Sequence, residues 1–252
     1  MRAVLLFFTI TLIHSLASGQ TINGFKGFDD SKLKPWLPRQ NQEYQYLYYF
    51  GFSKLQPSLI LIIDSDSCYA QIKYGEWVKK DKKRDWIWNY ETLKNVRIHG
   101  NKFFTDKTDG EFVIYDNTKG LVLYNLWRSV AKKGEYELGF VLASIDCYYY
   151  GKFSCASLRL LNEAELMKMT ISELEIMRNE IYARYGYIFN LGGEMDTYFK
   201  MQGWYKGQYK DVTTFPTELE KRNIRLIQTV EKIKTADNNQ ELSNLLVTAF
   251  IN

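Results

Sequence analysis

The sequence predicts an α+β protein, in which an N-terminal antiparallel β-meander, either a curled sheet or a small barrel, precedes a small all-α domain. Residues 44–156 contain short runs rich in aromatic and β-branched residues, with turn residues between them about every 8–12 positions. Over residues 157–236 the apolar positions instead recur at steps of three and four, which is typical of amphipathic helices.

Eight segments of the first region are predicted to be strands. They are Tyr44–Phe52, Leu59–Asp64, Cys68–Val78, Trp86–Leu93, Val96–Phe104, Glu111–Asp116, Leu121–Asn125 and Glu137–Ile145. Short connections favour antiparallel pairing, and no helical stretch separates the strands as a parallel sheet would require. Tight turns are expected at His99–Asn101, Asp109–Gly110 and Asn117–Gly120. The basic run Lys79–Asp85 is interpreted as a solvated hairpin turn.

Two helix starts carry the same capping pattern. Asn162 is followed three residues later by Glu165, and Thr170 is followed three residues later by Glu173. Each pair can form a capping box, in which the two side chains satisfy each other's backbone N–H groups. The pattern predicts a short helix and then a longer one over residues 171–185, which ends at the glycine that follows.

Three further helices are expected toward the C-terminus. A short one follows Gly192–Gly193, and a long one begins near Thr217, whose hydroxyl can form a third capping box with Glu220. Asn238 is expected to start a separate terminal helix over Glu241–Phe250, within a tail that comprises residues 237–252.

The first 19 residues have the pattern of a cleaved signal peptide. Arg2 precedes the apolar run Ala3–Ile13, and the small residues Ala17 and Gly19 stand where signal peptidase requires them. Residues 20–43 are expected to form an extended segment. No later segment is apolar enough to cross a membrane, so the sequence predicts a periplasmic or extracellular protein that does not span a membrane after signal removal.

Charge and composition exclude some classes of partner. Removal of Arg2 leaves 32 basic and 29 acidic residues, a surplus of only three (32 − 29), which does not favour nucleic acid as a partner. His99 is the one histidine outside the signal peptide, so a His-based zinc site or a Ser-His-Asp triad is not expected. We expect no metal and no cofactor.

The three cysteines allow one disulfide in an oxidising compartment. A turn centred on Gly151 would bring Cys147 opposite Cys155, and this pair is the tentative disulfide. Pairing of Cys68 with either of them, or three reduced thiols, are the alternatives.

The helix over residues 171–185 carries a charged residue on its apolar side. Arg178 lies four residues after Leu174 and three before Ile181, and Asn223 has an equivalent inward position in the last long helix. A buried polar group without a partner costs about 1–3 kcal/mol. We therefore expect the polar side chains of the two helices to satisfy one another.

Two hypotheses follow for this polar row. In the first, Arg178 or Arg184 pairs with a glutamate of the last helix, and amides and a tyrosine hydroxyl complete the bonds. This structural polar cluster comprises Arg178, Asn179, Glu220, Asn223 and Glu231. In the second, the row and a nearby aromatic pair form a binding surface for a glycan or peptide. Its residues are Tyr182, Arg184, Tyr185, Trp204 and Tyr205.

Aromatic residues of the strands are candidates for a second binding surface, at the mouth of a barrel. They are Tyr44, Tyr46, Tyr48, Tyr49, Phe50, Trp77, Trp86 and Trp88. The preference of strands for aromatic residues explains them equally well.

The segments LEIMRNEIYARYGYIF, MDTYFKMQGWYKG and ELEKRNIRLIQTVE occur in this order between Leu158 and Lys234. Together they resemble the YARHG domain, a family of small bacterial domains thought to be extracellular. Tyr185 departs from the family, whose naming motif has histidine there. The resemblance implies a bacterial source and a helical module, but it implies no activity.

We expect an exported bacterial envelope protein that is a non-enzymatic binding or structural module, whose partner is a cell-envelope glycan or protein. The alternatives are a carboxylate-based cell-wall or glycan hydrolase and a lipocalin-like carrier of a small apolar ligand. Two acids in one pocket would favour the hydrolase, whereas an aromatic-lined cavity without acids would favour ligand binding.

Overall fold

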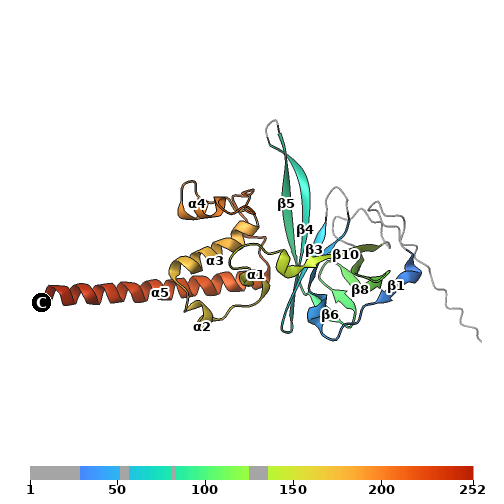
Figure 1. Ribbon diagram of the computed structural model, residues 1–252, viewed down its shortest axis with the longest axis horizontal. Coiled ribbons are helices and arrows are strands. Elements are labelled where there is room, and N and C mark those ends of the chain that lie inside the picture. The colour runs from blue at the N-terminus through green and yellow to red at the C-terminus, as the bar shows by residue number, and fades with distance from the viewer. Residues whose placement is uncertain (1–28, 52–56, 81–82, 125–135, 252) are drawn as a thin grey trace, which may run out of the picture.

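The computed structural model describes residues 29–51, 57–80, 83–124 and 136–251. A large antiparallel sheet forms the N-terminal part, and a group of helices packs beside it (Figure 1). The protein is therefore α+β, as the sequence predicts. The predicted signal peptide, residues 1–19, lies outside the described residues.

The described residues form ten strands. They are β1 (Leu33–Pro35), β2 (Tyr46–Tyr49), β3 (Ser58–Asp64), β4 (Ser67–Lys80), β5 (Lys83–Leu93), β6 (Arg97–His99), β7 (Lys102–Phe104), β8 (Asp109–Tyr115), β9 (Thr118–Tyr124) and β10 (Tyr136–Ser144). Their order is β5-β4-β3-β2-β10-β9-β8-β7-β6, and β1 pairs with β8. Strands β5 and β6 end the order without pairing with each other, so the sheet is open and is not closed into a barrel.

Of the three predicted turns, one has the expected place and a second is shifted toward the N-terminus, because Thr118, Lys119 and Gly120 of the predicted turn Asn117–Gly120 lie in β9. Gly100, with φ of +58°, turns the chain between β6 and β7. Asp116 and Asn117 both have positive φ and connect β8 to β9, as a two-residue hairpin loop requires. The turn predicted at Asp109–Gly110 is wrong, because both residues lie in β8 and pair with β9. Gly110 serves there to let the two backbones approach, since a Cβ would overlap with the Val122 carbonyl.

Strand β3 is buried on both sides, which explains its uninterrupted apolar sequence. Leu59, Leu61 and Ile63 pack into an aromatic core. Ile60 and Ile62 contact Leu219 and other residues on the opposite side. The aromatic core fills one side of the sheet with residues that include Trp36, Tyr44, Tyr48, Phe50, Phe103 and Phe112. Three of the residues expected at a barrel mouth, Tyr44, Tyr48 and Phe50, thus belong to the core.

The helices are α1 (Cys155–Leu158), α2 (Glu163–Leu166), α3 (Ile171–Arg184), α4 (Glu194–Lys200) and α5 (Glu218–Ile251), with short 3-10 turns η1 (Asp30–Lys32), η2 (Asn41–Tyr44) and η3 (Ile145–Cys147). The capping boxes of Asn162 with Glu165 and of Thr170 with Glu173 are both formed. Helix α3 ends at Gly186, whose φ is +77°.

The prediction of a separate terminal helix is wrong. Asn238 lies inside α5, which runs without interruption and projects beyond the rest of the molecule in Figure 1. The reason is that the residues around Asn238 include no proline or glycine that would end the first helix. None of the helices in the described ranges is both long and apolar enough to cross a membrane.

All three cysteines are free thiols. The predicted Cys147–Cys155 disulfide needs a hairpin around Gly151, whereas Cys147 lies in η3 and Cys155 begins α1. The chain between them is held by a different contact. Gly151, with φ of +113°, lies against the Glu180 carboxylate, which accepts hydrogen bonds from the backbone N–H groups of Lys152 (2.9 Å) and Phe153 (2.8 Å).

Candidate binding site between the sheet and the helices

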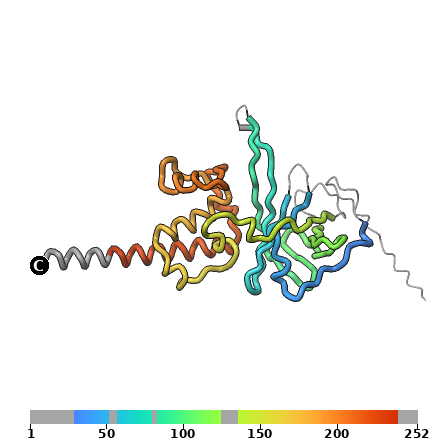
Figure 2. The backbone as a smooth tube through the Cα atoms, in the orientation of Figure 1, coloured from blue at the N-terminus to red at the C-terminus, as the bar shows by residue number. Residues whose placement is uncertain are grey.

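A pocket of about 330 Å³ lies where the β4–β5 hairpin meets the helical part. Strands β4 and β5 extend beyond the rest of the sheet, as the backbone trace in Figure 2 shows. Aromatic residues dominate the lining of the pocket. The lining residues are Gln71, Lys73, Trp86, Trp88, Tyr90, Tyr148, Tyr149, Tyr150, Ala183, Arg184, Tyr185, Gly186, Trp204, Lys206 and Gln208.

The strand register determines which residues form the sheet wall of the pocket. Lys73 pairs with Tyr90, and Gly75 pairs with Trp88, so alternate residues of β4 and β5 point to one face. Gly75 is required because a Cβ at this position would overlap with the indole ring of Trp86. The Trp86 and Trp88 rings are 5.5 Å apart and perpendicular, and together they form a continuous aromatic surface.

Lys73 projects from this wall into a group of aromatic rings. Its Nζ lies 4.4 Å from the ring centre of Trp88, 4.9 Å from that of Tyr148 and 6.0 Å from that of Tyr90. Burial lowers the pKa of Lys73 to about 8. None of the ion pairs among the described residues includes Lys73.

Arg184 belongs to the helical wall, and each of its three guanidinium nitrogens has a partner within the protein. Its Nε donates to the Tyr150 carbonyl at 2.7 Å, and its Nη1 donates to the Ser157 hydroxyl at 2.8 Å. Its Nη2 forms an ion pair with Glu180 one helical turn earlier. Burial raises the pKa of Glu180, and the Arg184 charge opposes that change. The arginine therefore fixes the loop before α1 against α3.

Tyr185 connects three elements at the base of the pocket. Its hydroxyl donates to Glu220 Oε2 at 2.6 Å and lies 3.3 Å from the Gln71 amide nitrogen. Its ring meets Tyr90 edge to face at 4.7 Å. Gln71 also donates to the Phe215 carbonyl at 2.6 Å. Strand β4, helix α3 and helix α5 are thus joined by buried polar contacts.

Two residues of the loop after α4 attach to the backbone of β5. The Gln208 side chain accepts from the Trp88 N–H at 3.4 Å and donates to the Trp86 carbonyl at 3.3 Å. The Tyr209 hydroxyl donates to the Trp88 carbonyl at 2.9 Å. These bonds occupy part of the edge of the sheet and hold the two walls of the pocket together.

Arg178, Glu231, Glu220 and Asn223 of the predicted polar cluster fall into three separate places, and Asn179 bonds within its own helix. Arg178 Nε lies 3.1 Å from both carboxylate oxygens of Glu231, so α3 and α5 are paired there. Asn179 donates to the Glu175 carbonyl within its own helix. Glu220 lies elsewhere, at Tyr185, and its other carboxylate oxygen accepts from the Ser157 hydroxyl at 2.6 Å.

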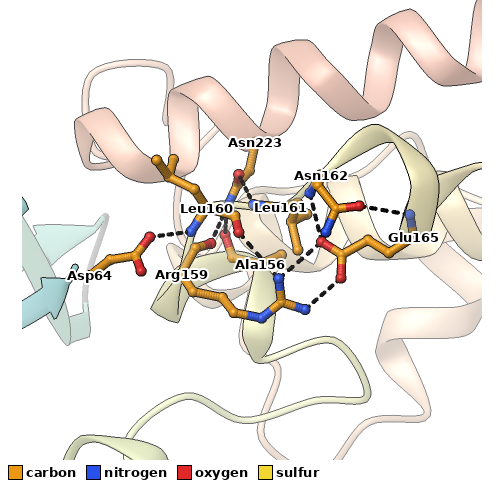
Figure 3. A network of polar contacts seen from close by, with 8 residues as sticks. All are labelled: Asp64, Ala156, Arg159, Leu160, Leu161, Asn162, Glu165 and Asn223. Atoms are coloured by element: carbon orange, nitrogen blue, oxygen red, sulfur yellow. Dashed lines mark hydrogen bonds and ion pairs between the residues drawn. The ribbon is translucent and has the colours of Figure 1, made fainter.

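Asn223 lies at the third place, shown in Figure 3. Its side chain bonds to backbone groups rather than to an arginine side chain. Its amide nitrogen donates to the carbonyls of Ala156 (2.9 Å) and Arg159 (2.8 Å), and its oxygen accepts from the Leu161 N–H (2.9 Å). Asp64 of β3 accepts from the N–H of Leu160 at 2.7 Å beside it. The segment between α1 and α2 is thereby attached to both α5 and the sheet.

The predicted binding residues divide between two sides of the helical part. Arg184, Tyr185 and Trp204 line the pocket. Tyr182 instead lines a smaller hollow beside Arg178, and Tyr205 packs with Phe189 and Phe199 while its hydroxyl donates to the Tyr187 carbonyl at 2.6 Å.

Sequence reasoning missed Lys73 and most of the sheet wall. The signal for it is a lysine at an alternate position of a strand whose partner strand carries Trp86, Trp88 and Tyr90 at matching alternate positions. Trp86 and Trp88 were expected at a barrel mouth, but they face the helices instead. Within the described residues, no group of three His, Cys, Asp or Glu side chains is placed to hold a metal ion.

The helical wall belongs to a small module that packs against the sheet and supplies half of the pocket. Residues 150–232 match the YARHG domain family, so the C-terminal part of the chain contains a YARHG domain, whose function is unknown. The N-terminal region is left unassigned. No curated protein and no solved structure matches the chain. The naming motif corresponds to residues 182–186, and its last four residues line the pocket.

Proposed function

We propose that the protein is an exported bacterial envelope protein that binds a sugar ring of an envelope glycan in the pocket between its sheet and its YARHG domain. The observation that carries this proposal is the composition of the pocket. Eight of its 15 lining residues are aromatic, and none is Asp or Glu. Broad aromatic faces with a few polar groups are the usual lining of a small-molecule site.

The rim of the pocket suits a sugar better than a purely apolar ligand. Tyr150, Trp204 and Lys206 each carry a hydrogen-bond donor, and Tyr150 is 58% exposed. A pyranose ring has apolar faces and hydroxyl edges, so stacked rings and peripheral donors match it. A carrier of the lipocalin kind would need space inside the sheet, where Tyr44 and Phe112 stack at 3.8 Å within a packed core.

A hydrolase is less well supported by the same pocket. Glycosidases place two carboxylates on opposite sides of the scissile bond. Glu180 and Glu220 bond to the lining residues Arg184 and Tyr185, and both acids are buried and bound to protein donors. Neither is among the residues that line the pocket.

Replacement of Trp88 by alanine is expected to weaken binding of a disaccharide of N-acetylglucosamine and N-acetylmuramic acid by about tenfold or more, because a tryptophan that a bound ligand covers contributes over 1 kcal/mol. Calorimetric titration of the mature protein measures this. Trp77→Ala is the matched control, because Trp77 lies on the same face of the hairpin but is 63% exposed and does not line the pocket. Equal loss in both variants, or no binding by the wild type, would contradict the proposal.

Export is the second part of the proposal and rests on residues 1–19. The protein expressed from its full reading frame in a bacterial host is expected to be recovered outside the cytoplasm with Gln20 as its first residue. N-terminal sequencing of the fractionated protein measures this. Recovery in the cytoplasm with the first 19 residues still attached would exclude a cleaved signal peptide.

A further inference from the structure

We infer that Lys73 is the anchor for a negatively charged group, and that the ligand of the pocket is an acidic sugar that carries a carboxylate. The inference rests on the proposed function and specifies its ligand. It is carried by the position of Lys73, whose ammonium group lies among aromatic rings on the wall of the pocket.

Lys73 differs from the six lysines that form ion pairs within the described residues. Lysines 32, 102, 107, 152, 200 and 221 each form an ion pair with a carboxylate. Lys73 is more buried than a surface lysine and contacts only rings, at 4.4 Å from Trp88 and 4.9 Å from Tyr148. Cation–π contacts offset part of the loss of hydration, but buried ammonium groups are normally paired with an anion. A carboxylate bound in the pocket would supply that pair.

The two other cations of the pocket do not fill this role. Arg184 already bonds to Tyr150, Ser157 and Glu180, so three of its five N–H donors are used and its charge is paired with a carboxylate. Lys206 lies at the exposed rim. Lys73 combines a position among the aromatic rings of the lining with an ammonium group that makes no ion pair among the described residues. No acid in the lining would repel an approaching carboxylate.

The aromatic surroundings also determine the form of the ligand. A carboxylate bound at Nζ would lie beside the rings of Trp88 and Tyr148, so a flat body that carries it can stack on them. A sugar ring with a carboxylate on a short arm has this shape. N-acetylmuramic acid, which bears a lactyl carboxylate, is a suitable probe, and its methylamide is the same molecule without the charge.

The test measures binding of two forms of the N-acetylglucosamine–N-acetylmuramic acid disaccharide, the free carboxylate and the methylamide, by calorimetric titration at pH 7. The wild type is expected to bind the carboxylate form about tenfold or more tightly than the methylamide, as a charge-assisted bond predicts. Lys73→Met is expected to bind both forms equally, with an affinity close to that of the wild type for the methylamide.

Lys119→Met is the matched control. Lys119 also lies over aromatic rings, at 4.6 Å from Trp36, but it is outside the pocket. This variant is expected to keep the preference for the carboxylate. If the wild type binds both forms equally, or if Lys73→Met keeps the preference, the inference is overturned and the sugar site stands. If the wild type binds neither form, the proposed function fails as well. Circular dichroism of each variant verifies that it is folded.

Discussion

Replacement of Glu220 by alanine is expected to lower the free energy of unfolding by about 3–5 kcal/mol, because it removes the acceptor of several buried donors at once. The carboxylate is completely buried and accepts from the hydroxyls of Ser157 and Tyr185 and from the N–H of Thr217. Water cannot readily replace the acceptor for two of these donors, since Ser157 and Thr217 are 0% and 1% exposed. Urea denaturation measures the change.

Glu218→Ala is the control for this result. Glu218 lies two residues earlier in the first turn of α5, its side chain is 54% exposed, and it pairs with Lys221 at the surface. Exposed pairs contribute about 0–1 kcal/mol, so the loss should be small. A Glu220→Ala loss no greater than that of Glu218→Ala would show that the contacts of Glu220 do not hold the junction together.

Replacement of Lys73 by methionine is expected to stabilise the protein by about 1–3 kcal/mol at pH 7, because the folded protein buries an ammonium group that makes no ion pair among the described residues. Methionine has a similar length and keeps the packing against Trp88 and Tyr148. The residue would then be one that the protein retains at a cost in stability, as is common for groups that bind a ligand.

The size of this effect depends on pH. Between pH 8 and 10.5 the unfolded chain keeps the proton of Lys73 whereas the folded protein loses it, so the unfolded state binds more protons. The stability of the wild type relative to Lys73→Met should therefore rise across this window. The difference in melting temperature between the two proteins should be largest at pH 7 and should decrease toward pH 10.5. A difference that does not change with pH would show that Lys73 is not destabilised by burial.

Local signals predicted the elements of this fold well. The capping boxes at Asn162 and Thr170 depend on residues three apart, and the hairpin strands depend on alternation and turns, so neighbouring residues contain the information. The error at Asn238 has the same origin. A good cap residue does not start a helix where nothing ends the preceding one.

The pocket could not be predicted in this way, because its walls come from distant parts of the chain. Gln71 and Tyr185 are in contact although 114 residues separate them. Spacing correctly indicated that Arg178 faces α5, but it could not distinguish Glu231 from Glu220 as the partner. Arg184 lies on the same helix and turns to a different neighbour, the loop around Gly151. The packing of α3 between α5 and the loop around Gly151 decides which of these polar side chains meet.

The buried contact of Tyr185 with Gln71 and Glu220 has a thermodynamic consequence for the whole molecule. Because strand β4 and helices α3 and α5 meet there, neither half can melt without exposing side chains of the other, and heating should give a single cooperative transition. A molecule bound between the two walls would raise the midpoint temperature of that single transition, by an amount set by its concentration and dissociation constant. A thermal-shift assay with a panel of glycans would therefore detect binding at the junction without a label on the protein or the ligand.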